Sequence, residues 1–260
     1  MDDSLTALVR QHDPDRFLTV LFAPPAKRDA LLALYAFNHE LARAREVASE
    51  PTLALMRLQW WREVVEGAVR HHVVATPLHG AIEAGMLSRD DLLAVVEARE
   101  IEAEAEIESM ADWRGYVLAG AGGLSVAAAR ALNAPEPEAV RPFGAAYGVA
   151  GLLRSWRLLA AQGRCLLPGD LLVEHGLSRE EAVAVPDSPC VQKVLARLAD
   201  EGRGFLRQGT KAAVPGAPVA AALPAVFARR DLARWPQPAP LRRGIGDRMA
   251  VIVAGVRGRL

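Results

Sequence analysis

One stretch of the sequence places a histidine, an arginine and a glutamate where they can act together. His39, Arg43 and Glu46 are four and three residues apart, so on an α-helix they lie on one face. A guanidinium on such a face can hold an anionic headgroup through charge-assisted hydrogen bonds. The spacing equally suits an ordinary ion pair between Arg43 and Glu46 within the helix. We treat the three residues as candidate ligand-binding residues and keep the ion pair as the alternative.

Two other groups of polar residues are interpreted as surface features. Acidic residues recur at positions 97, 100, 102, 104, 106 and 108. Such a density is typical of a solvated helix face, with a counter-charge such as Arg99 nearby. His71, His72 and His79 lack the accompanying cysteine or carboxylate pattern of a metal site. No Gly-rich phosphate loop or Ser/His/Asp set is evident, so the sequence predicts neither a metal centre nor an unrelated enzymatic activity.

The apolar residues that must position these groups recur every three or four positions along nearly the whole chain. Ala and Leu, which favour helices, make up most of them, and no sustained period-two alternation argues for a sheet. The predicted fold class is therefore all-α, as a single domain over residues 1–260. Several helices are apolar on more than one face, as helices around a central cavity are, although an ordinary bundle core gives the same pattern. Helices are expected at residues 27–47, 52–70, 88–106, 109–132, 137–161, 188–213 and 241–257, with another over 217–225.

Charge and composition restrict the partners and the location. Lys+Arg and Asp+Glu each total 31, so no whole-molecule field favours nucleic acid, and we expect none as a partner. The two cysteines, Cys165 and Cys190, are too few for a disulfide framework and indicate a reducing compartment. The first residues lack the layout of a secretory signal, and no apolar run approaches the roughly 20 residues that span a bilayer. We expect a cytoplasmic protein, with peripheral contact on the inner face of the cytoplasmic membrane left open.

Two parts of the chain resemble squalene and phytoene synthases. The first comprises residues 22–28 (FAPPAKR), 34–37 (LYAF) and 57–63 (RLQWWRE), and the second comprises residues 144–147 (GAAY), 152–154 (LLR) and 163–168 (GRCLLP). They stand in the family's order and separation, and the likeness covers residues 16–181. The resemblance implies an isoprenoid synthase-type helical bundle around a central cavity. It also implies that Arg154 and Arg164 lie near the diphosphate end of that cavity, where they bind an anion or pair with other residues.

The same resemblance shows what is missing. In the active enzymes, two aspartate-rich motifs hold magnesium ions against the diphosphate of an allylic substrate. The positions that match the first motif are Ala42, Arg43 and Glu46, and those that match the second are Ser155, Leu158 and Leu159. Only Glu46 is acidic, and the two leucines are expected to make the cavity wall apolar where a hydrated magnesium ion would sit. We therefore predict no catalytic residues, no prenyl transfer and no cofactor.

This loss of carboxylates resembles one branch of the family, the complex I assembly factors of mitochondria and their bacterial relatives. The likeness lies in residues 36–38, 40–42, 49–50, 55–59, 167–168, 170 and 175–176. It implies a non-catalytic assembly or lipid-binding factor, with complex I subunits as protein partners or an isoprenoid or lipid in the cavity. The alternative is an active head-to-head prenyltransferase that uses Glu46 and a rearranged magnesium site.

Overall fold

A computed structural model describes residues 3–46, 50–104, 106–213, 218–237 and 243–260. These residues form helices and connecting turns without any β-strand, which confirms the predicted all-α class. In chain order the helices are α1 (Asp3–His12), α2 (Pro14–Val20), α3 (Pro25–Glu46), α4 (Pro51–Glu66), α5 (Ala75–Glu83), α6 (Arg89–Glu104), α7 (Met110–Val117), the π-helical turn η1 (Leu118–Gly122), α8 (Gly123–Ala131), the 3-10 turn η2 (Pro137–Val140), α9 (Arg141–Ala161), α10 (Gly169–Glu174), α11 (Arg179–Ala184), α12 (Pro189–Ala212), the 3-10 turn η3 (Val219–Ala221), α13 (Pro224–Arg234) and α14 (Ile245–Arg257).

Local sequence signals set several of these boundaries. A capping box starts α7, since the Ser109 hydroxyl accepts from the Asp112 amide while the Asp112 carboxylate accepts from the Ser109 amide. Ser188 caps α12 by accepting from the Val191 amide. Gly67 ends α4 with a φ of 123°, a conformation open to glycine, so this helix stops before the expected residue 70.

The expected long helices are present, with several differences. The helix expected at 137–161 begins as the 3-10 turn η2, and α9 starts only at Arg141. The segment 109–132 is interrupted by η1, where the π turn inserts one extra residue into the helical repeat. The predicted helix at 217–225 is wrong: η3 is a single 3-10 turn, and α13 begins only at Pro224. The predicted helix at 241–257 is observed from Ile245, and residues 241 and 242 lie outside the described ranges, as do 47–49.

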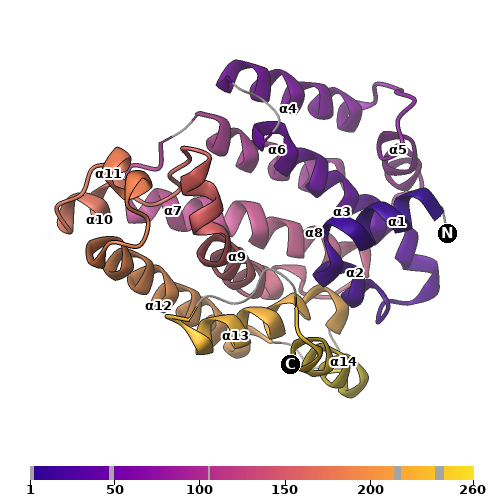
Figure 1. The fold of residues 1–260 in the computed structure, drawn as a ribbon. Helices are drawn as coiled ribbons and strands as arrows, with labels where there is room; N and C mark the ends of the chain where they lie inside the picture. The colour runs from indigo at the N-terminus through magenta and orange to yellow at the C-terminus, as the bar shows by residue number, and fades with distance from the viewer. Residues whose placement is uncertain (1–2, 47–49, 105, 214–217, 238–242) are drawn as a thin grey trace.

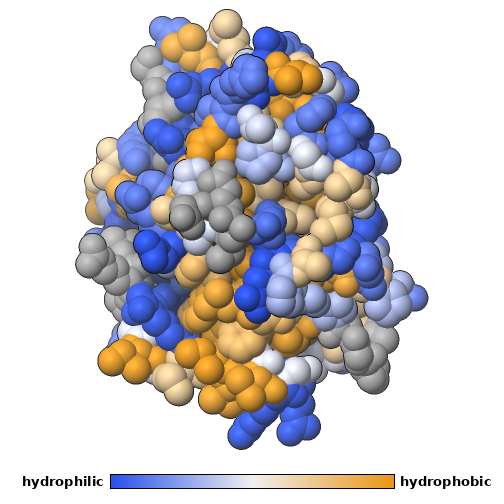
Figure 2. Space-filling model, turned by 90° about the vertical axis from the view of Figure 1, so that its right-hand side faces the viewer, coloured by the Kyte–Doolittle hydropathy of each residue, from blue (hydrophilic) through white to orange (hydrophobic). Residues whose placement is uncertain are grey.

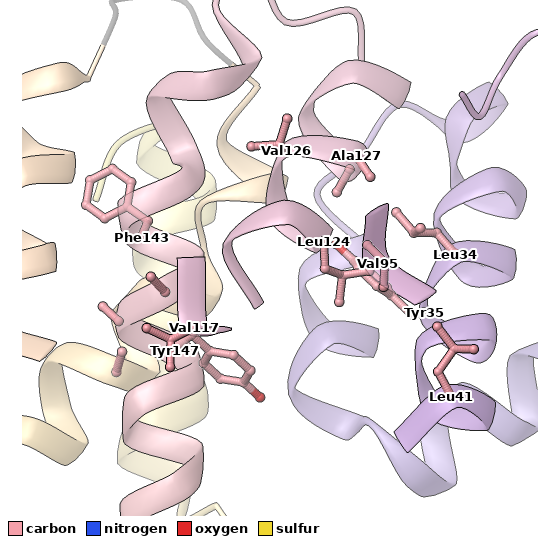
Figure 3. Packing of buried hydrophobic residues seen from close by; sticks show 14 of the residues in the cluster. Leu34, Tyr35, Leu41, Val95, Val117, Leu124, Val126, Ala127, Phe143 and Tyr147 are labelled. Carbon is pink, nitrogen blue, oxygen red and sulfur yellow. The ribbon is translucent and has the colours of Figure 1, made fainter. Parts of the chain in front are cut away.

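Figure 1 shows α9 near the middle of the molecule, α4 along one edge and α12 to α14 along the opposite edge. Helix α9 packs against α12, α13 and η1, while α4 packs against α6. The buried apolar residues form one continuous cluster. Within it, side chains of α8 lie between Phe143 and Tyr147 of α9 on one side and Leu34 and Tyr35 of α3 on the other (Figure 3).

None of the described helices combines the length and the apolar character needed to cross a membrane.

Candidate functional site

A half-open cavity of about 230 Å³, lined by both polar and apolar side chains, lies among the helices of the bundle. Helices α2, α3, α6, α7, α9 and the π turn η1 contribute to its wall, together with the segment that follows α9. Its lining comprises Arg16, Ala42, Arg99, Glu102, Tyr116, Val117, Gly120, Ala121, Tyr147, Gly148, Gly151, Leu152, Ser155, Leu159, Arg164 and Leu166. Three arginines and a single carboxylate are among these lining residues.

The first arginine is Arg16, on the short helix α2. Asp13 caps this helix by accepting from the Arg16 amide at 3.1 Å, and it also accepts from Arg16 Nη1 at 2.8 Å. The guanidinium carbon lies 4.8 Å from the centre of the Tyr147 ring and 5.7 Å from that of Tyr35. Such stacking over aromatic faces suits a planar guanidinium, so Arg16 is held rigidly at the cavity wall.

The lining carboxylate, Glu102 of α6, is surrounded by donors. It accepts from Arg99 Nη1 at 2.5 Å, from the Tyr116 hydroxyl at 2.7 Å and from Arg164 Nη2 at 3.4 Å. Burial, and then the charge of Glu102, raise the pKa of Tyr116 well above its ordinary value, so the phenol stays protonated and donates. The negative charge of Glu102 is therefore already compensated by Arg99 and Arg164 within the protein.

Arg99 retains unused hydrogen-bonding capacity. Besides Glu102, it donates from Nη2 to the Asn38 side-chain oxygen at 3.0 Å. Its Nε atom is buried and has no hydrogen-bond partner among the residues that the structure describes. A buried donor without a partner is costly.

The positions matching the aspartate-rich motifs divide between the cavity and the surface. Ala42, Ser155 and Leu159 line the cavity, as do Gly148 and Gly151 one turn before the second motif. The Ser155 hydroxyl donates back to the Gly151 carbonyl at 2.8 Å. Leu158, expected on the cavity wall, instead points outward with 55% of its surface exposed, because it lies about 100° around the helix from Leu159.

The candidate ligand-binding residues are also separated. Arg164 lines the cavity, whereas His39, Arg43 and Arg154 do not. Arg43 is half-exposed and pairs with Glu40 at 3.7 Å, and Arg154 donates to Asp231 at 3.0 Å. The side chain of Glu46, the last residue of α3, lies outside the described residues, so the expected Arg43–Glu46 pair stays a prediction.

His39 is unsuited to binding an anion in this arrangement. Its ring stacks on His12 with the ring centres 4.3 Å apart. Burial, and then the nearby His12, lower the pKa of His39, so the imidazole is neutral at neutral pH.

Magnesium does not fit the side chains that line the cavity. This hard cation takes several oxygen ligands, usually one or two carboxylates with substrate phosphate and water. Glu102 is the one carboxylate in the described lining, and its oxygens already accept from two guanidinium groups and a phenol. The three arginines would repel a divalent cation. Elsewhere too, the described residues form no group of three or more His, Cys, Asp or Glu side chains placed to hold a metal ion.

The sequence identified only part of this cavity. Sequence patterns do not distinguish Arg16, Tyr116 and Tyr147 as site residues, and Glu102 is buried at the cavity, not on the solvated face that its acidic neighbours predict. The signal that distinguishes Glu102 is local: Arg99 precedes it by three residues on the same helix, which places both side chains on one face. The expected counter-charge role of Arg99 is confirmed, although the pair faces the cavity.

This all-helical bundle has the isoprenoid synthase type of fold. Two solved structures share it over 98% of this chain: a dehydrosqualene synthase in complex with ligand, with a TM-score of 0.78, 14% identity and 95% of that chain covered, and the squalene synthase HpnC from Alicyclobacillus acidocaldarius, with a TM-score of 0.70, 17% identity and 93% covered. At this identity they show the fold alone. The squalene/phytoene synthase family model matches residues 9–237, and the chain belongs to that family.

Several curated relatives carry the name NADH dehydrogenase (ubiquinone) complex I, assembly factor 6. The proteins of Mus musculus and Homo sapiens are 27% and 26% identical to this chain over 208 residues, which cover 77% of this chain and 62% of each relative. The Drosophila melanogaster homolog is 30% identical over 192 residues, which cover 68% of this chain and 57% of the relative. The chain thus spans about three fifths of the length of these relatives.

Proposed function

We propose that this protein is a non-catalytic member of its family that assists assembly of the membrane-bound NADH dehydrogenase. The observation that carries the proposal is the cavity itself: Ala42, Ser155 and Leu159 line it at positions that match the aspartate-rich motifs. Its one described lining carboxylate, Glu102, is already paired with arginines. The similarity to proteins named as complex I assembly factors supports this role and points to complex I subunits as partners. A cytoplasmic location, with peripheral membrane contact, agrees with a partner that is itself membrane-bound.

Deletion of the gene in its host tests the assembly role. We expect the deletion strain to lose assembled, NADH-oxidising complex on native gels, and a plasmid copy of the gene to restore it. The Gly144→Ala variant, which the packing of α9 should destabilise, serves as a reference for loss of folded protein. Normal amounts of assembled complex in the deletion strain contradict the proposal.

Loss of catalysis has its own test. Purified protein is incubated with labelled farnesyl and geranylgeranyl diphosphates, with and without magnesium. We expect no prenylated product in either condition. Magnesium-dependent product formation supports the alternative of an active head-to-head prenyltransferase and contradicts the non-catalytic proposal.

A second candidate function is metal-free binding of a phosphorylated or other anionic isoprenoid or lipid headgroup in the cavity. The observation that favours it is the gathering of three arginines, Arg16, Arg99 and Arg164, around one cavity. Guanidinium groups bind phosphate oxygens through paired, charge-assisted hydrogen bonds and need no metal to do so.

Calorimetric titration with inorganic diphosphate and with farnesyl diphosphate, both in a chelating buffer, tests this binding. We expect saturable binding that weakens about tenfold or more in Arg164→Gln. Arg157→Gln is the matched control, because the Arg157 side chain is 68% exposed and pairs with the surface residue Asp187. Binding of farnesyl diphosphate without binding of inorganic diphosphate would assign the affinity to the hydrocarbon chain, and absence of both contradicts the candidate function.

A further inference from the structure

Helix α14 presents a stripe of aliphatic side chains to solvent. Ile245 is 83% exposed and Val256 is 77% exposed, values far above those of the core. Successive residues of an α-helix are rotated by about 100° about its axis. Residues 245, 249, 253 and 256 are separated by four, four and three positions, so their side chains lie on one side of the helix. This side, which we call the α14 stripe, consists of Ile245, Met249, Val253 and Val256.

The opposite side of α14 is fixed against the rest of the protein. Asp247 is buried and accepts from Arg230 Nε at 2.6 Å and from Arg234 Nη2 at 2.6 Å, both on α13. Val251 is fully buried, and Gly255 lies directly under the ring of Phe22. The outward direction of the stripe therefore follows from well-packed contacts on the inner side of the helix.

Arginines flank the stripe. On the helix, Arg248 lies to one side of the stripe and Arg257 to the other, both exposed. Arg229 of α13 and Arg259 extend this positive border. Among the described residues, none of these four arginines has a carboxylate partner.

The whole C-terminal region is positively charged although the chain as a whole is neutral. Residues 218–260 contain eight arginines, no lysine, no glutamate and two aspartates. Both aspartates are buried and already paired: Asp231 with Arg154 and Arg243, and Asp247 with Arg230 and Arg234. The charge available to a partner at this end of the molecule is thus strongly positive.

Figure 2 shows an apolar area at the lower end of the molecule, at the height where α14 lies in Figure 1, bordered by hydrophilic atoms. The turn after α2 adjoins it, since Phe22 packs on Gly255 and the neighbouring Leu21 is 45% exposed. The apolar face therefore extends beyond a single helix.

We propose that the α14 stripe and its arginine border dock on the surface of a membrane that contains anionic phospholipid, with the helix axis parallel to the bilayer. Aliphatic side chains enter the boundary of the acyl chains, while arginines beside them reach the phosphate groups. A protein partner is less well matched, since protein interfaces usually centre on aromatic anchors that fill specific pockets, and the stripe is wholly aliphatic. This inference concerns lipid binding by the isolated protein and does not depend on the assembly role.

Co-sedimentation of the purified protein with lipid vesicles tests the proposal. One set of vesicles contains phosphatidylcholine alone, and the other contains phosphatidylcholine mixed with phosphatidylglycerol. We expect binding to the mixed vesicles that weakens with added salt. Each arginine near an anionic surface contributes about fivefold to partitioning, so Arg248→Gln combined with Arg257→Gln should reduce binding by about an order of magnitude or more. Val253→Glu places a charge in the stripe and should abolish binding.

Two control variants distinguish binding through this surface from non-specific binding to lipid. Met56→Glu changes an aliphatic residue of α4 that is 64% exposed, and Arg207→Gln removes an exposed arginine of α12. Circular dichroism confirms that each variant is folded. Failure of the wild-type protein to bind the mixed vesicles overturns the proposal, as does a loss in Met56→Glu equal to that in Val253→Glu. A third outcome would also overturn the proposal: the protein does not bind vesicles but binds purified NADH dehydrogenase subunits in the absence of lipid, and Val253→Glu abolishes that binding. This result would assign the surface to a protein partner.

Discussion

The hydroxyl of Tyr116 donates a 2.7 Å hydrogen bond to the carboxylate of Glu102 inside the cavity. Arg99 and Arg164 donate to the same carboxylate, so three donors within the protein already contact it. In a magnesium site, carboxylates must keep lone pairs free for the ion. Here both oxygens of the one described lining carboxylate accept from protein donors, so it has little capacity left for a metal ion.

Replacing the cavity carboxylate should lower stability while improving anion binding. In Glu102→Gln, Arg99 and Arg164 lose the charge that compensates them, although the amide oxygen still accepts. We expect the free energy of unfolding to fall by about 2 kcal/mol in phosphate-free buffer, below the full cost of breaking a buried pair. Inorganic diphosphate should restore part of this loss, because it binds only the folded protein. Urea titrations with and without diphosphate measure both effects.

The matched control for this prediction is Glu97→Gln, an exposed position on the same helix. Its stability should change by no more than about 0.5 kcal/mol and should respond to diphosphate as the wild type does. A Glu102→Gln protein as stable as the wild type, or one that gains nothing from diphosphate, contradicts our account of the cavity.

Two glycines of α9 should respond to alanine in opposite directions. A Cβ atom at Gly144 would collide with the Ser125 hydroxyl and with the Ala121 carbonyl oxygen, whereas a Cβ at Gly151 meets nothing within 4 Å. Gly144→Ala should therefore lower the free energy of unfolding by about 1–3 kcal/mol through overpacking. Gly151→Ala should raise it by about 0.5–1 kcal/mol, because alanine costs less backbone entropy in a helix. Thermal unfolding of both variants measures whether each substitution raises or lowers stability. Equal changes in the free energy of unfolding would contradict the close packing of α9 against η1 and α8.

Much of the fold was predictable because helical periodicity depends on residues close in sequence. The segments that became α3, α6, α9 and α12 were all expected near their observed ends. Short helices such as α10 and α11, six residues each, were not expected, since so few residues show no period. The π turn η1 escaped prediction for a different reason: its extra residue lies among Gly and Ala, whose small side chains carry little pattern.

The site was less predictable, because helical rotation and contacts between distant segments decide which side chains meet. Leu158 and Leu159 are neighbours in sequence, yet one is exposed and the other lines the cavity. Arg16 and Arg164 stand far apart in the chain, yet both line the same cavity in the folded protein. Sequence spacing within one helix gave the His39 and Arg43 candidates, and the rotation of α3 places Ala42 on the cavity instead.

Asp247 should make stability depend on pH in the acidic range. The hydrogen bond from Arg234, with that from Arg230, lowers the pKa of this carboxyl to about 2. Its pKa in the unfolded chain is higher, so the carboxylate stabilises the fold above that value and the contribution disappears as pH falls toward 2. We expect the stability difference between the wild type and Asp247→Asn to shrink by about 2 kcal/mol between about pH 6 and pH 2. Urea titrations across this range measure it, and a constant difference would exclude this linkage.

The buried guanidinium of Arg243 joins the two ends of the chain and should be among the most sensitive positions. Its Nε donates to Asp15 of α2 at 2.9 Å, and its Nη1 donates to Asp231 of α13 at 2.5 Å. Among the described residues, removing it leaves the Tyr147 hydroxyl as the one side-chain donor to buried Asp15, while Asp231 keeps Arg154. We expect Arg243→Ala to lower the free energy of unfolding by about 3–5 kcal/mol, because an uncompensated buried charge is costly.

Adding Asp15→Asn should recover part of that loss, since the amide removes the charge and still accepts from Tyr147. Chemical denaturation of the two single variants and the double variant gives the coupling between the residues, and strictly additive effects would show that the pair does not act as a unit.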